Sequence, residues 1–134
     1  MKKYYPELFL FPIFFALVMV VALPSVSAQT TPYTPEKGSA ERKAILDGIR
    51  KYRKSPNEVY APTGFKAQNG WVFVSAPDPN DPDVDTLAFD LLLQKVGKIW
   101  KVVAEVSHTE GSDYNKEIKR IRKKFPKASA EILK

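Results

Sequence analysis

The chain has 134 residues, no cysteine and a formal net charge of +6 at pH 7. This length provides apolar side chains for one domain with a modest core and excludes a large multidomain protein. The absence of cysteine excludes disulfides, thiol nucleophiles and cysteine-ligated zinc, so stability has to come from packing and backbone hydrogen bonds.

Residues 1–28 are typical of a secretory signal peptide: Lys2 and Lys3 precede an apolar run from residue 8 to residue 23, and small side chains follow it. The alternative is an uncleaved membrane anchor, but the run contains a proline and is shorter than the roughly 20 apolar residues of a spanning helix. We therefore expect cleavage between Ala28 and Gln29, export to the periplasm or the exterior, and no membrane span after processing. Because residue 29 is glutamine, a lipid-modified cysteine at the new N-terminus is excluded.

Residues 29–38 are rich in proline and threonine and predict a flexible lead-in, which leaves one domain over residues 39–134. Ser39 is a suitable N-cap, and apolar side chains recur after it at helical spacing. The pattern predicts a first helix over residues 40–53, ending before Pro56.

Residues 58–76 predict a β-hairpin. Asn69-Gly70 is the dipeptide that a type I′ turn favours, because both central residues of that turn need positive φ, and an apolar run begins at Trp71. Pro62 and Gly64 favour an edge position for the first strand.

The segment from Pro77 to Asp85 predicts a solvated loop, because it combines prolines with aspartates. Its oxygen-bearing side chains suggest calcium, but the EF-hand pattern fails, since Pro82 and Phe89 stand where it needs a ligand and a glutamate. A charged loop that blunts the sheet edges is favoured over a looser calcium site, so no metal site is predicted. The side chains considered were Asp78, Asn80, Asp81, Asp83 and Asp85.

A second hairpin is predicted from the apolar runs 87–94 and 99–107, which meet around Gly97. Side chains alternate along a strand, so alternate residues of the last strand are expected on one core-facing side. These are Trp100, Val102, Ala104, Val106 and His108.

An amphipathic helix is predicted from about residue 113 to residue 125, with Asp113 as its N-cap rather than a pocket carboxylate, and a short terminal helix after Pro126. The remaining faces of the amphipathic helix are basic. They could bind phosphates of an anionic envelope component, or they could be an ordinary solvated surface. The cations are Lys116, Lys119, Arg120, Arg122, Lys123 and Lys124.

The predicted fold class is α+β: an N-terminal helix, a four-stranded antiparallel meander of two hairpins, and a C-terminal amphipathic helix, in a plan where a helix covers one face of a curved sheet. The segments 39–50, 69–74, 97–103 and 125–128, with Ser112-Asp113, resemble those of a group of small exported bacterial proteins. That group is similar in plan to cystatin-like and nuclear-transport-factor-2-like domains, and its members mostly have no assigned activity. The resemblance covers nearly the whole chain after residue 28 but rests on structural motifs, and the basic second helix departs from it, so it implies a fold and no function.

A pocket in such a plan would be lined by Trp71, Asp90, Trp100, Glu105 and His108, although both tryptophans could equally be core residues. His108 is the only histidine and has acidic neighbours along the chain, but no serine or cysteine nucleophile stands in a recognisable setting. No catalytic residue is therefore predicted.

The sequence thus favours a non-catalytic binding module of the cell envelope, without a cofactor, whose partner is a protein or an anionic envelope component. Nucleic acid is not expected, because the chain is exported and the middle of the sequence is acidic. One alternative is a pocket-bearing ligand-binding protein or small enzyme of the nuclear-transport-factor-2-like kind. An inhibitor acting through the loop from Pro77 to Asp85 would need an inhibitory motif, and none is recognisable there.

Overall fold

A computed structural model describes residues 30–77, 87–106, 108 and 111–134. Within these ranges the elements are α1 (Ala40–Arg53), β1 (Gly64–Gln68), β2 (Trp71–Pro77), β3 (Leu87–Val96), β4 (Ile99–Val106) and α2 (Tyr114–Lys124). The predicted α+β class, with a four-stranded antiparallel sheet and two helices, is confirmed. The described residues include neither the predicted signal peptide nor its cleavage site between Ala28 and Gln29, so α1 is the first described element and not the start of the chain. Residues 78–85 of the predicted aspartate-rich loop also lie outside the described residues.

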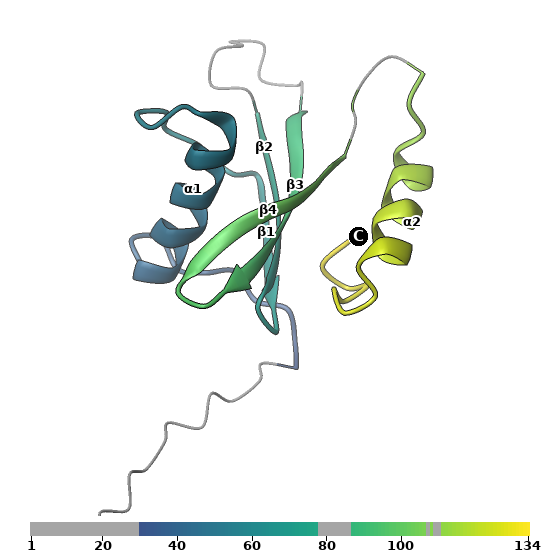
Figure 1. Ribbon diagram of the computed structural model, residues 1–134, viewed down its shortest axis with the longest axis horizontal. Coiled ribbons are helices and arrows are strands. Elements are labelled where there is room, and N and C mark those ends of the chain that lie inside the picture. Colours follow the sequence, from purple (N-terminus) through teal and green to yellow (C-terminus); the bar gives the residue numbers. More distant parts are fainter. Residues whose placement is uncertain (1–29, 78–86, 107, 109–110) are drawn as a thin grey trace, which may run out of the picture.

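The sheet is a meander in which each strand pairs with its neighbour in sequence, in the order β1-β2-β3-β4 (Figure 1). Asn69 and Gly70 join β1 to β2 with φ angles of 49° and 78°, as the predicted turn requires. The first strand is shorter than the predicted run, beginning at Gly64, after Pro62. Both β1 and β4 are edge strands.

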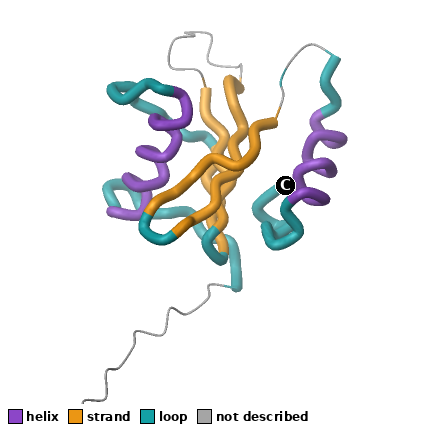
Figure 2. The backbone as a smooth tube through the Cα atoms, viewed as in Figure 1, coloured by secondary structure: helices purple, strands orange, loops and turns teal. Residues whose placement is uncertain are grey.

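Both faces of the sheet are covered, whereas the predicted plan covered one. Helix α1 lies against one face, and α2 with the C-terminal segment lies against the other (Figures 1 and 2). Along β2, Val72 and Val74 belong to the α1 core, while Trp71 and Phe73 belong to the α2 core. A strand buried on both sides needs apolar residues at consecutive positions, which explains the unbroken apolar run in β2.

A register shift in the β3–β4 pair changes the face to which β4 side chains point. Leu92 pairs with Ala104 and Leu93 with Val102, so Val103 is an extra residue on β4. As a result Trp100 and Val102 pack on the α1 side, and Ala104 and Val106 pack on the α2 side. The single core-facing side predicted for Trp100, Val102, Ala104 and Val106 is therefore wrong, because a bulge reverses the alternation.

The helix ends follow local sequence signals. The Ser39 hydroxyl accepts a hydrogen bond from the Arg42 backbone N–H at 3.1 Å, and the Asp113 carboxylate accepts one from the Lys116 backbone N–H at 3.2 Å. The prediction of Asp113 as an N-cap is confirmed. Beyond α2 the chain forms turns rather than the predicted short helix, but Ile132 and Leu133 are buried in the α2 core.

Residues 30–38, predicted as a lead-in, lie along the outer edge of β1. Tyr33 exchanges two backbone hydrogen bonds with Ala67, at 2.9 and 2.8 Å, and the Thr34 hydroxyl donates to the Phe65 carbonyl at 2.8 Å. These contacts cover part of the free edge of β1. No helix within the described ranges is long and apolar enough to cross a membrane.

Candidate functional site

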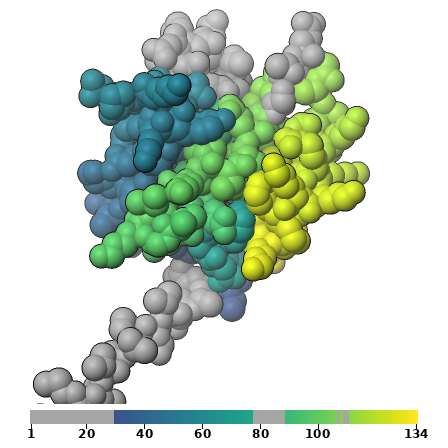
Figure 3. Space-filling model, viewed as in Figure 1, coloured from purple at the N-terminus to yellow at the C-terminus, as the bar shows by residue number. Residues whose placement is uncertain are grey.

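Helix α2 separates apolar from basic side chains. Ile118 and Ile121 are buried against the sheet. On the opposite side, at spacings of three, four and seven residues, lie four exposed cations, which we call the basic stripe: Lys116, Lys119, Arg120 and Lys123. Figure 3 shows the C-terminal part of the chain, in yellow, forming one side of the molecule beside β4.

The predicted anion-binding residues are not equivalent in the structure. The Arg120 guanidinium pairs with the Glu117 carboxylate at 2.8 Å. Arg122 is partly buried and donates to the Ala130 and Leu133 carbonyls at 3.3 and 3.0 Å, so it holds the C-terminal segment against α2. The Lys124 ammonium lies 5.4 Å from the centroid of the Phe125 ring.

The other predicted cations, Lys116, Lys119 and Lys123, have ammonium groups that make no ion pair with any described residue. Three neighbouring lysines with no counterion among the described residues give this side of α2 a positive potential. The stripe can therefore attract an anionic surface.

The five predicted pocket residues are divided between the two faces of the sheet. Trp71, Asp90 and His108 lie on the α2 side, and Trp100 and Glu105 lie on the α1 side. Both tryptophans are core residues, with 7% and 5% of their surface exposed. The structure thus brings no common pocket together from these five side chains.

Asp90 and His108 do come together. The Asp90 carboxylate is 1% exposed, and its Oδ2 lies 3.2 Å from Nε2 of His108. Burial, followed by the charge of Asp90 and a hydrogen bond to it, raises the pKa of Tyr114 to about 12. Because Tyr114 is the first residue of α2, these side chains place the start of α2 beside β3.

Glu105 faces α1 instead. Its Oε2 accepts a hydrogen bond from the Tyr52 hydroxyl at 2.9 Å, and its Oε1 lies 3.8 Å from the Arg53 guanidinium. The hydrogen bond to Glu105 is the largest cause of a raised pKa of Tyr52. These contacts join the end of α1 to β4.

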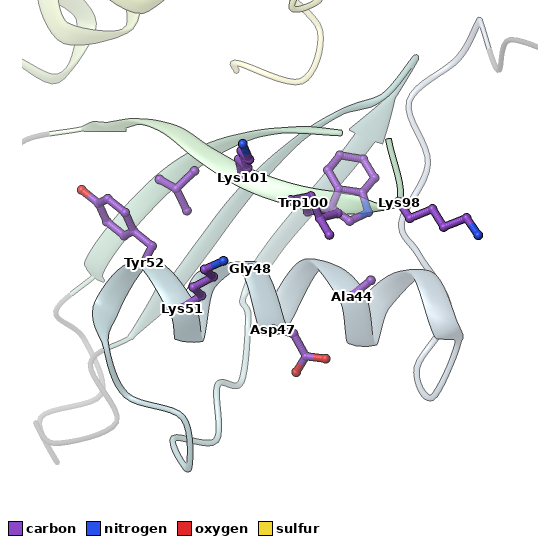
Figure 4. A pocket seen from close by; sticks show the side chains of 10 residues that line it. Ala44, Asp47, Gly48, Lys51, Tyr52, Lys98, Trp100 and Lys101 are labelled. Carbon is purple, nitrogen blue, oxygen red and sulfur yellow. The ribbon is translucent and has the colours of Figure 1, made fainter. Parts of the chain in front are cut away.

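A groove of about 440 Å³ runs along the contact between α1 and β4, and we call it the α1–β4 groove (Figure 4). One wall is a single face of α1, formed by Ala44, Asp47, Gly48, Lys51 and Tyr52, and the other wall is residues 98–102 of the hairpin end and β4. The predicted pocket residue Trp100 is part of this second wall. A volume of this size is within the usual range for small-ligand sites, about 300–1,000 Å³.

Gly48 is the residue that brings the two walls together. A Cβ atom at this position would lie 2.5 Å from the Trp100 carbonyl oxygen, so only glycine permits the approach of α1 to β4. Sequence reasoning missed this groove. The available signal was a glycine in mid-helix, which costs about 1 kcal/mol relative to alanine and often marks close packing.

The walls of the groove carry more basic than acidic side chains. Lys51, Lys98 and Lys101 are exposed and have no ion-pair partner among the described residues. The one acidic residue of the walls, Asp47, is bound at its two carboxylate oxygens by Lys43 at 2.7 Å and Arg50 at 2.8 Å. Hydrogen bonding from Lys43 is the main reason that the pKa of Asp47 is lowered.

In the described ranges no group of three or more histidine, cysteine or acidic side chains is arranged to hold a metal ion. Comparison with protein-family models, with curated proteins and with solved structures gives no match. The candidate sites of this chain are therefore the basic stripe and the α1–β4 groove, each argued from its own geometry.

Proposed function

We propose that this protein is an exported, non-catalytic binding module of the cell envelope, and that it binds phosphate groups of anionic lipids through the basic stripe of α2. The observation that carries the proposal is the row of three lysines that have no counterion in the described part of the chain, opposite the buried face of the same helix. The signal-peptide pattern of residues 1–28 supports export to the periplasm or the exterior, where such lipids are present.

A helix packed on an antiparallel meander also supports the cystatin-like or nuclear-transport-factor-2-like plan, which we keep as a proposal for the fold. The structure differs from the expected plan in one respect, because α2 and the C-terminal segment cover the second face of the sheet. The alternative of a pocket protein or small enzyme of that kind has less support, because the side chains expected to line its pocket lie on both sides of the sheet.

The expected affinity is modest and dependent on salt. Each lysine or arginine near an anionic membrane surface contributes about 1 kcal/mol, so the three lysines of the stripe, without Arg120, which is paired with Glu117, contribute about 3 kcal/mol. Exposed charges are screened over about 10 Å at 0.1 M salt. Binding through the stripe should therefore weaken strongly as salt is added.

The test is co-sedimentation with vesicles of phosphatidylglycerol and, separately, of zwitterionic phosphatidylcholine. We expect binding to the first only, and at least a tenfold loss in K119E/K123E, because each reversal replaces an attraction by a repulsion. K37E/K54E is the matched control, since it changes the net charge equally at exposed positions flanking α1 and should bind as the wild type does.

Equal loss in the two double variants would contradict the proposal, because it would show that net charge and not the stripe decides binding. Binding that persists at high salt would contradict it as well. Inorganic phosphate distinguishes the source of the anion: if it competes at low concentration, a single free phosphate is bound rather than a lipid surface.

A further inference from the structure

We infer that the α1–β4 groove is a second binding site, on the other side of the sheet from the basic stripe, and that it takes an acyl chain carrying an anionic head group. This inference does not rest on the proposed function. The groove is elongated: its helical wall extends from residue 44 to residue 52, about 12 Å at 1.5 Å per residue.

The walls of the groove offer apolar surface to such a chain. Gly48 and Ala44 have the smallest side chains of the α1 wall, and Trp100, which is 5% exposed, belongs to the opposite wall. Ile99 and Tyr52 border the groove and are 50% and 47% exposed, so two large apolar side chains lie at its rim in contact with water. An apolar ligand would remove this surface from water.

The charges select an anionic head group. Lys51 extends from α1 and Lys98 from the turn just before β4, so a cation stands at each wall of the groove (Figure 4). The Lys101 side chain lies on the other face of β4. Asp47 is already neutralised by Lys43 and Arg50 and does not compete with an anion for Lys51 and Lys98. A carboxylate or phosphate at the rim would therefore meet the ammonium groups of Lys51 and Lys98.

An added β-strand fits this groove less well than an acyl chain. Edge strands bind extended peptides through their free backbone groups. Here Gly48 lies directly against the Trp100 carbonyl, so α1 covers the backbone edge of β4 at this residue. The remaining space suits a narrow, flexible, apolar ligand.

The test is a titration of ¹⁵N-labelled protein with decanoate, followed by amide NMR shifts, with decanol as the uncharged analogue. We expect saturable shifts at Gly48, Ile99 and Lys101, and weaker binding of decanol. K51Q/K98Q should raise the Kd of decanoate at least about tenfold at low salt, because two ammonium groups are lost. The matched control K37Q/K54Q removes two exposed charges beside α1 and should leave the Kd unchanged.

A44F places a ring in the groove and should abolish the shifts while the far-ultraviolet circular dichroism stays that of the wild type. If A44F fails to fold, the Kd of decanoate for K51Q/K98Q and for its control K37Q/K54Q decides whether the inference holds. Equal affinity for decanoate and decanol, an unchanged Kd in K51Q/K98Q, or shifts confined to α2 would each overturn the inference. Decanoate binding that survives in K119E/K123E, beside lost vesicle binding, would support this site independently of the proposed function.

Discussion

At the scale of single residues, Gly48 has the largest consequence for the proposed ligand site. A glycine inside a helix is normally a weakness, because the backbone loses more freedom on folding. Here it allows α1 to touch the Trp100 carbonyl and so determines the packing of α1 on β4 along the α1–β4 groove.

Gly48→Ala should destabilise the protein by up to about 2 kcal/mol. The better helix propensity of alanine, about 1 kcal/mol, is outweighed by overpacking against backbone, which costs about 1–3 kcal/mol. The measurement is the free energy of unfolding in urea. The helix propensity of alanine relative to glycine is measured separately at Lys43, on the exposed side of α1, as the difference in unfolding free energy between Lys43→Ala and Lys43→Gly. Both variants lose the ion pair with Asp47, so that loss cancels in the difference. If Gly48→Ala raises the free energy of unfolding by as much as the value for Lys43→Ala exceeds that for Lys43→Gly, the close contact at Gly48 carries no cost.

At the scale of elements, α2 depends on its attachment at both ends. Asp113 caps its first turn, and Arg122 donates to the carbonyls of the C-terminal segment. The helix is strongly basic, so its charges repel one another and its packing and caps have to compensate.

Asp113→Ala should therefore cost about 1 kcal/mol of unfolding free energy, because the Lys116 backbone N–H loses its acceptor. Asp113→Ser keeps a capping oxygen and should stay near the wild type. Hydrogen exchange at the amide of Lys116 is the local measurement and should accelerate in the alanine variant only. Equal behaviour of the two variants would show that the side chain of Asp113 does not cap α2.

At the scale of the whole molecule, one sheet separates two cores. Strands β2 and β3 contribute to both of them, since Phe89, Leu91 and Leu93 face α1 and Leu92 faces α2. Shared strands should make the two cores unfold together. The basic stripe and the α1–β4 groove lie on opposite sides of this sheet, which is why each can be altered separately.

Ile121→Ala, in the α2 core, should cost about 2–5 kcal/mol and lower the stability of both cores equally. Trp71 reports on the α2 core and Trp100 on the α1 core, so W71F and W100F backgrounds each leave one fluorescent reporter. Coincident unfolding curves from the two reporters are expected for one cooperative domain. Earlier loss of the Trp71 signal alone would show that α2 unfolds as a separate unit.

The sequence by itself determined the features that depend on neighbouring residues. Ser39 and Asp113 predicted the two helix starts, and Asn69-Gly70 predicted the turn between β1 and β2, because caps and tight turns are made within a few positions of the chain. The apolar patterns were enough to predict the α+β class and the antiparallel sheet.

Only the tertiary structure decided which of these residues meet. The extra residue Val103 reverses the faces of β4, so Trp100 and Glu105 are separated from Asp90 and His108 by the sheet. No local signal marks a bulge, because it is fixed by the register with β3. The α1–β4 groove likewise arises from a contact between Gly48 and Trp100, which are far apart in the chain, and packing between distant segments is physically absent from any short stretch of sequence.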